Sequence, residues 1–224
     1  MIAYGDSFKD IGADLVSHYV NPNQLQDMSK RLHVCETLFG DFDAKVLVLL
    51  QDAADADKLI DNGAVDCSKP VLRHFEGALT NKRLVDWFGD YFQVSITGDG
   101  SSSCGLYYAN AIWLIKRFGG MSGPIVRRSE VLEACTPVLC ATLKNLKNLE
   151  IVFAFGMQAY DSISRMLGVE TSWQSAKDSL LAEQVIFAGR TINLVALNHP
   201  AARVSHKLTK ERLHNFLDHF DFQR

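Results

Sequence analysis

The chain has 224 residues, of which 47% are hydrophobic and 22% charged, and its formal net charge is −3. This composition is that of a globular protein with a sizeable core, and the charge balance gives no overall attraction to nucleic acid, although a local basic face remains compatible with it. Because no basic start precedes an apolar stretch and no apolar run reaches membrane-span length, we expect one cytoplasmic domain over residues 1–224 and no membrane partner.

The first half of the chain contains two apolar runs that predict strands. Residues 1–42 are expected to form a helical N-terminal extension, because apolar residues in "QLQDMSKRLHVCETLF" recur at spacings of three and four. The compact run "AKVLVLL" then predicts a fully buried strand. A helical pattern follows in "ALTNKRLVDWFGDYF", and "TGDGSSSCG" reads as a loop before the second buried strand, "LYYANAIWLI".

The second half repeats the alternation of helix and strand. The stretch "SEVLEACTPVLCATLKNL" predicts a long helix with Ser129 as its N-cap, which Pro137 should bend or split. A third buried strand, "LEIVFAFG", leads into the helix "MQAYDSISRML". The stretch "QVIFAGRTINLVAL" predicts a hairpin around Gly189 and Arg190, whose second arm is the fourth central strand, and "HKLTKERLHNFLDHF" an amphipathic last helix.

Strands separated by helices imply crossover connections between parallel strands. We therefore predict an α/β fold, a three-layer α/β/α sandwich around a central, mostly parallel four-stranded sheet. The segments that directly follow the strands, "QDAAD", "NAIW", "GMQA" and "HPAAR", should converge on one edge of that sheet. Open α/β sheets bind their ligands at this edge, which makes it the expected site.

Four side chains near this edge have both a catalytic or binding interpretation and a structural one. Asp52 can orient or deprotonate a water, or cap the next helix. The amide of Asn110 can read the imide edge of a nucleobase, or bridge to a neighbouring loop. His199, on a loop stiffened by Pro200, can donate to an oxygen that gains negative charge, or cap a neighbouring element. Phe75 can stack on a flat ligand beside a glycine, or lie in the core.

Together and in this order, these stretches resemble the uracil-DNA glycosylase superfamily over residues 45–206. "LLQDAA" is similar to its first motif and keeps Gln51 and Asp52, and "RHFEGAL" resembles a segment of the iron–sulfur branch, with Phe75 in the base-stacking position. "YYANAIWLIKR" places Asn110 on the base-reading asparagine. "IVFAFGMQAY" resembles the family's strand, glycine and short helix, and "ALNHPAARVSH" resembles the loop that supplies His199 and a wedge that enters the duplex.

The resemblance implies a hydrolase for base excision repair, acting as a monomer without cofactor on DNA that contains uracil or a related deaminated base. Asp52 would position the attacking water and favour a cationic sugar, and His199 would stabilise the departing base. Gln51, Phe75 and Asn110 would bind that base, and the DNA contacts would come from Pro200, Arg203, Val204 and Lys207. Phosphate contacts or a merely solvated surface are both open for the basic residues Lys116, Arg117, Arg127, Arg128, Arg203 and Lys207.

The sequence also departs from the family pattern. Leu50 and Ala53 replace the glycine and proline of the first motif, Ala201 replaces a serine that touches phosphate, and His74 stands where the iron–sulfur branch has proline. A catalytically inactive relative that binds nucleic acid or a protein partner is therefore the alternative. An unrelated α/β enzyme acting on a small nucleotide is a third possibility, although GxGxxG, P-loop and GxSxG motifs do not occur.

The cysteines argue against a metal centre. The chain has five, an odd number with no CxxC pair, which favours reduced thiols over a disulfide framework. Cys135 and its surroundings resemble the last cluster cysteine of the iron–sulfur branch, but such a cluster needs four thiolates and the preceding positions lack them. Cys135 and Cys140 are five apart on a predicted helix, too far round for a small metal site. We expect neither metal nor cluster.

Overall fold

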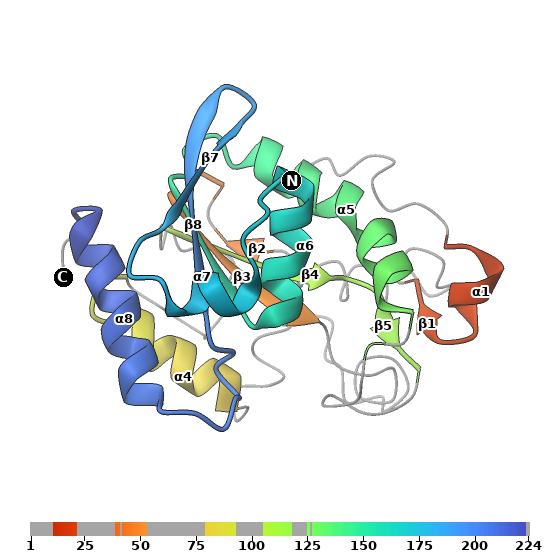
Figure 1. The fold of residues 1–224 in the computed structure, drawn as a ribbon, viewed down its shortest axis with the longest axis horizontal. Helices are drawn as coiled ribbons and strands as arrows, with labels where there is room; N and C mark the ends of the chain where they lie inside the picture. The colour runs from red at the N-terminus through yellow and green to blue at the C-terminus, as the bar shows by residue number, and fades with distance from the viewer. Residues whose placement is uncertain are drawn as a thin grey trace.

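The computed structural model of the protein describes residues 11–21, 39–40, 42–52, 79–92, 105–117, 125 and 127–222. Within them the main sheet has six strands in the order β2-β4-β3-β6-β8-β7 (Figure 1). Its four central strands run parallel to one another: β3 (Val46–Asp52), β4 (Leu106–Ile112), β6 (Ile151–Phe155) and β8 (Arg190–Leu197). These are the four strands that the apolar runs predict. The edges are formed by antiparallel β2 (Phe39–Gly40) and β7 (Glu183–Phe187).

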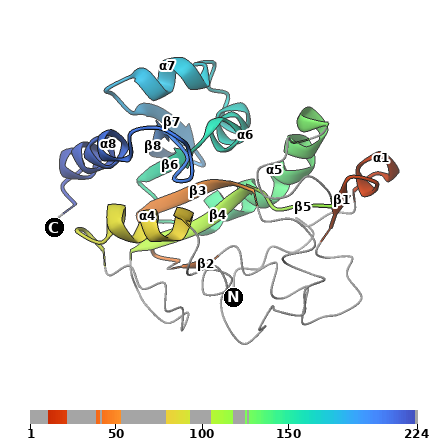
Figure 2. The same ribbon diagram turned by 90° about the horizontal axis from the view of Figure 1, so that it is seen from below.

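Helices cover both faces of this sheet, which confirms the α/β/α sandwich. One face packs against α5 (Arg128–Asn145), α6 (Met157–Leu167) and α7 (Trp173–Asp178). The opposite face packs against α4 (Leu79–Phe88) and α8 (His206–His219), which lie side by side in Figures 1 and 2. Among the described helices, none combines the length and apolar character that crossing a bilayer requires.

The central strands read as continuous apolar runs because both faces are buried. In β3, Leu47 and Leu49 point into the cluster under α5 and α6, whereas Val46 and Val48 point into the cluster under α4 and α8. All four are completely buried. Alternating side chains on a strand with two covered faces leave no position for a polar residue, so the first polar side chains, Gln51 among them, mark the strand's end.

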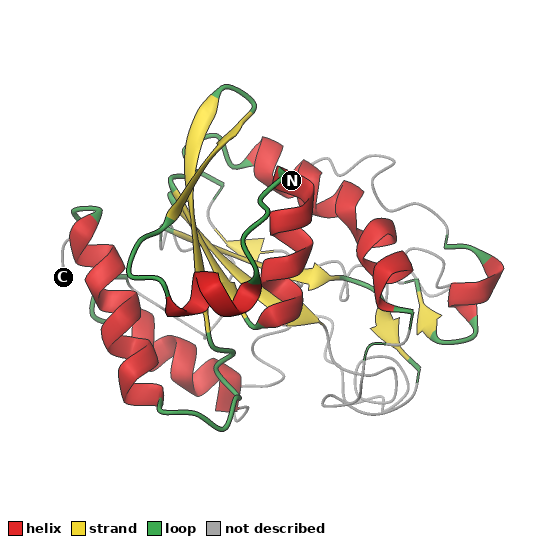
Figure 3. Ribbon diagram, viewed as in Figure 1, coloured by secondary structure: helices red, strands yellow, loops and turns green. Residues whose placement is uncertain are grey.

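A second, two-stranded sheet lies beyond the carboxyl end of β4. It pairs β1 (Tyr19–Val20) with β5 (Ile115–Lys116) in antiparallel register, next to the short helix α1 (Ala13–Val16), at the right of Figure 3. An apolar cluster of its own joins this sheet to the first turns of α5: Ile11, Leu15, Tyr19, Ile112, Trp113, Leu114, Val131, Leu132, Cys135 and Val138.

Several local predictions need correction. Two parts of the expected helical extension, at β1 and β2, are strands, because their residues pair with β5 and β4; residues 22–38, which carry the rest of the pattern, lie outside the described residues. Ser129 is inside α5 and does not cap it: Arg127, with a positive φ of 51°, precedes the helix. Pro137 does not split α5. The hairpin turn is Ala188–Gly189, both with positive φ, and Arg190 already belongs to β8.

Candidate functional site

Three of the four predicted strand ends supply residues that meet at one point. Gly156 follows β6, and a Cβ built on it would lie 3.4 Å from His199 Cβ and 3.7 Å from Gln51 Oε1. Its φ of 94° is closed to ordinary L-residues, so only glycine leaves this gap open without strain. The ends of β3, β6 and β8 therefore bring Gln51, Gly156 and His199 together, as the sequence predicts.

Asp52 is the last residue of β3, and its carboxylate is almost completely enclosed. Its side chain is 10% exposed, and its Oδ2 lies 2.8 Å from Lys116 Nζ. Gln51 Nε2 donates a long hydrogen bond of 3.4 Å to Oδ1. Burial raises the pKa of Asp52 above its ordinary value, while the hydrogen bond and charge of Lys116 oppose this rise. Residues 53–60 lie outside the described residues, so the helix-capping interpretation stays a prediction.

Lys116 is the residue whose role the sequence interpretation missed. The sequence left a phosphate contact and a solvated surface open for it, but its side chain is only 3% exposed and its Nζ lies 2.8 Å from Asp52 Oδ2. The cause lies in a distant part of the chain: Lys116 belongs to β5, which pairs with β1, and its side chain is buried in this arrangement. A lysine that closes an apolar run, "NAIWLIK", was the available signal, because lysine is almost never fully buried unless it is paired.

His199 follows β8 with its ring oriented by the loop itself. The backbone N–H of Ala201 donates to His199 Nδ1 at 3.1 Å, and the N–H of Ala202 donates to the His199 carbonyl at 2.8 Å. Burial lowers the pKa of His199 to about 4, so the imidazole is neutral at neutral pH. Since Nδ1 accepts a hydrogen bond, the single ring proton of the neutral form is on Nε2, which is therefore a donor.

Asn110 lies one strand away from Asp52 on the same face of the sheet. It pairs in register with Leu50, and Asp52 pairs with Ile112, so strand alternation puts the side chains of Asn110 and Asp52 on one face. Asn110 is half-buried, and no described residue hydrogen-bonds its amide. Phe75 lies outside the described residues, and its stacking role stays a prediction.

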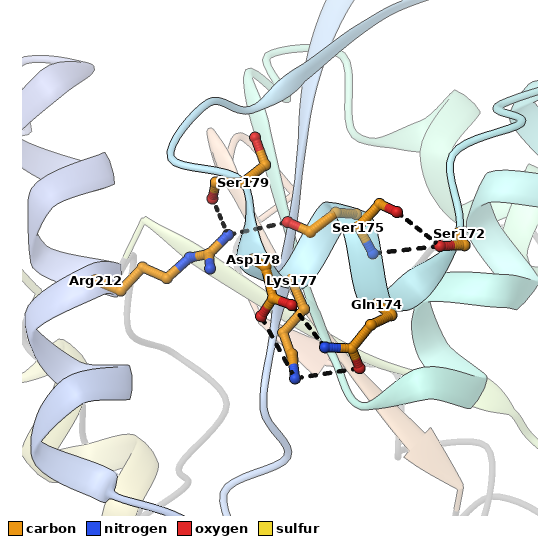
Figure 4. A network of polar contacts seen from close by, with 8 residues as sticks. Ser172, Gln174, Ser175, Lys177, Asp178, Ser179 and Arg212 are labelled. Carbon is orange, nitrogen blue, oxygen red and sulfur yellow. Dashed lines mark hydrogen bonds and ion pairs between the residues drawn. The ribbon is translucent and has the colours of Figure 1, made fainter.

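The loop after β8 is anchored at both ends. Arg83 on α4 donates to the carbonyl oxygen of Pro200, and Trp87 stacks on His206, the first residue of α8, with ring centroids 6.2 Å apart. Farther along α8, Arg212 donates to the carbonyls of Ala176 and Ser179 at the end of α7 (Figure 4). These contacts fix α8 against α4 and α7, and with it the loop that carries His199.

The residues expected to contact DNA follow His199, in this loop and in the first turn of α8. Pro200 is buried, whereas Arg203 is exposed and Val204 is 42% exposed. Lys207 is 85% exposed, with its Nζ 3.8 Å from Glu211 Oε1. Of the other basic residues, Arg127 pairs with Asp14 and Glu130, and Arg128 pairs with Asp161, so both charges are already engaged within the protein.

No protein-family model matches the sequence, and no curated protein matches it. Over the part of the chain that the structure describes, no group of three or more His, Cys, Asp or Glu side chains is placed to hold a metal ion. Cys135 is buried, and burial raises the pKa of its thiol to about 12, so this thiol is a poor metal ligand in its protonated form.

We expect the half-buried His199 to make stability fall between about pH 6.5 and pH 4. Its folded-state pKa lies below the ordinary value of 6.5, so the unfolded chain takes up a proton in this range and the folded protein does not. Relative to His199→Gln, the wild type should lose on the order of 1–2 kcal/mol of unfolding free energy as the pH falls through this window, after allowance for solvent screening. Urea titrations at about pH 7 and pH 4.5 measure this difference.

The control for this prediction is His219→Gln, which removes an exposed histidine at the end of α8. This variant should follow the wild type at both pH values. If His199→Gln shows the same pH dependence as the wild type, then His199 is not held neutral by burial.

Proposed function

We propose that the protein is a DNA glycosylase that hydrolyses the N-glycosidic bond of uracil or a related deaminated base in DNA. The observation that carries the proposal is the meeting of Gln51, Gly156 and His199 at the carboxyl edge of the sheet, with the Asp52 carboxylate next to Gln51. The half-buried amide of Asn110 on the neighbouring strand and an exposed loop after His199 support it. These are the elements that hydrolysis of a flipped-out nucleotide requires.

Asp52 would act on the water. A carboxylate at the sheet edge accepts a hydrogen bond from water and directs its oxygen toward C1′ of the sugar, and its negative charge favours the positive charge that develops there. The C1′–N bond breaks as the water oxygen bonds to C1′. The water's proton passes to the carboxylate and the electron pair stays with the departing base.

His199 would act on the departing base. Because Ala201 occupies Nδ1, the neutral ring presents Nε2–H to an oxygen of the base as that oxygen gains negative charge. A neutral imidazole can stabilise the anionic base by a hydrogen bond. Unlike a charged imidazolium, it does not add the free-energy cost of burying a charge. Gly156 leaves room beside His199, and Asn110 would read the imide edge of the base. Arg203, Val204 and Lys207 would contact the DNA around the extruded nucleotide.

The alternative is a protein of this fold that binds nucleic acid or a protein partner without catalysis. One specific observation favours it: Lys116 engages Oδ2 of Asp52, and a buried ion pair can serve structure alone. The altered first motif, with Leu50 and Ala53, points the same way. The second carboxylate oxygen supports catalysis, since Oδ1 makes only the long contact to Gln51 among the described residues.

Incubation with uracil-containing oligonucleotides tests the proposal. Single- and double-stranded substrates carrying uracil, hypoxanthine or xanthine are treated with the protein and then with alkali, which cleaves abasic sites. We expect strand breaks with at least one base, and we expect His199→Ala to slow them by about 10²- to 10³-fold, the usual effect of losing one oxyanion donor.

The other outcomes separate the alternatives. Retention of DNA without strand breaks, measured by gel shift at a stated salt concentration, would replace the glycosylase with a binding protein. If the protein neither cleaves nor retains DNA, the small-nucleotide enzyme is the hypothesis to pursue.

A further inference from the structure

Lys116 and Asp52 form an ion pair inside the protein. Nζ and Oδ2 are 2.8 Å apart, and the two side chains are 3% and 10% exposed. Removing two charges from water costs several kcal/mol for each ion, and an apolar pair of similar volume is often as stable. Stability of the fold therefore gives little reason for a buried lysine at position 116. Because its partner Asp52 belongs to the candidate site, a role in the chemistry of that site is the other reason.

The backbone fixes where the Lys116 ammonium lies. Lys116 pairs with Tyr19 in the β1–β5 sheet. The following residue, Arg117, donates its backbone N–H to the His18 carbonyl at 2.9 Å and its Nε to the Val16 carbonyl at 2.8 Å. The segment 11–21 thus holds β5 in register on the side away from the main sheet. Lys116 consequently reaches Asp52 from a braced strand, and not from a flexible surface loop.

We propose that Lys116 is a positioning residue of the candidate site, whose ammonium group holds Oδ2 of Asp52 and thereby leaves Oδ1 turned toward the attacking water; this inference rests on the proposed function. A carboxylate held at one oxygen cannot rotate freely, so the direction of its second oxygen is set. The lysine also opposes the effect of burial, which on its own favours the protonated acid. A protonated Asp52 would be unable to accept the proton of the water.

Two other groups bear on the charge of Asp52. Gln51 donates to Oδ1 but carries no charge. His199, which meets Gln51 across Gly156 from the loop after β8, is neutral above about pH 4. Within the described residues, Lys116 is therefore the charged group whose removal should alter the ionisation of Asp52 most.

The test is the pH–rate profile of uracil excision in wild type, Lys116→Met and Lys116→Arg. In Lys116→Met we expect the acid limb, where activity falls as Asp52 takes up a proton, to move up by at least about one pH unit, with a tenfold or larger loss of kcat at pH 7. Lys116→Arg, which keeps the positive charge, should hold the limb close to that of the wild type. The control is Lys45→Met, which removes the exposed Lys45–Glu150 pair at the opposite edge of the sheet and should leave the profile unchanged.

A second measurement does not need activity. The carboxyl carbon of Asp52 in 13C-labelled protein, assigned by its loss in Asp52→Asn, should titrate at higher pH in Lys116→Met than in the wild type. If the wild type excises no base, the proposed function fails while this titration still decides whether Lys116 controls Asp52. A folded Lys116→Met with an unshifted profile and an unshifted titration overturns the inference.

Folding of the variants is checked by circular dichroism. If Lys116→Met does not fold, Lys116→Gln replaces it, because glutamine keeps a hydrogen-bond donor without the charge, and the same upward shift is expected. If both uncharged variants fail to fold while Lys116→Arg folds, the lysine serves stability and the inference is overturned.

Discussion

Asp52→Asn should lower the rate of base excision by two to four orders of magnitude, the range that a positioned general base contributes. The amide is nearly isosteric with the carboxylate but can neither accept the water's proton nor favour a cationic sugar. Oligonucleotide cleavage under single-turnover conditions measures the loss, because that regime reports the chemical step and not product release.

Stability has to be separated from chemistry in this variant. Asp52→Asn removes one partner of a buried ion pair, which typically costs about 3–5 kcal/mol. The double variant Asp52→Asn with Lys116→Met removes both charges and should regain most of that stability while remaining inactive. A folded double variant that excises uracil at the wild-type rate would show that Asp52 has no catalytic role.

Gly156→Ala should reduce excision by about 10- to 100-fold, although it changes no reacting group. At a φ of 94° and a ψ of 161°, alanine is strained by about 1–3 kcal/mol, and its methyl group would fill the gap between His199 and Gln51. Relief of that strain moves the backbone on which the start of α6 and the His199 contact depend. A displacement of about 1 Å at a reacting group is enough to cost the upper end of this range.

The matched control is Gly168→Ala. Gly168 ends α6 with a φ of 71°, so alanine is strained there as well, but its Cβ would meet nothing within 4 Å. We expect Gly168→Ala to lose stability and keep its activity per folded molecule. Equal activities of the two alanine variants, each corrected for the folded fraction by urea titration, would show that the gap at Gly156 does not matter.

The central sheet was predictable because its signal is strong and local. Each parallel strand is covered on both faces and must therefore be an unbroken apolar run, as in β6, and a polar residue at the end of such a run identifies the sheet edge. The same logic placed Gln51 and His199 near each other. The ends of α6 were equally accessible, since Gly156 and Gly168 bound it on either side.

The parts that were not predictable depend on partners distant in the chain. Tyr19–Val20 lay within the expected helical extension, but pairing with Ile115–Lys116 makes these residues a strand. Ser129 has the chemistry of an N-cap, yet the helix starts two residues earlier than this cap would place it, at Arg128 directly after Arg127. The inward direction of Lys116 follows from that same pairing of β1 with β5. No window of neighbouring residues contains the information that decides such cases.

The brace formed by α1 and β1 has a consequence for how the protein can be divided. A fragment starting at residue 42 would retain all four parallel strands and the described helices α4 to α8 that cover them, yet it would lose the carbonyl groups of Val16 and His18 that hold Arg117. Trimming the protein to this layered body thus removes a support of the Lys116–Asp52 ion pair. A shortened protein that folds and is inactive would therefore point to the missing support and not to the chemistry of the sheet edge.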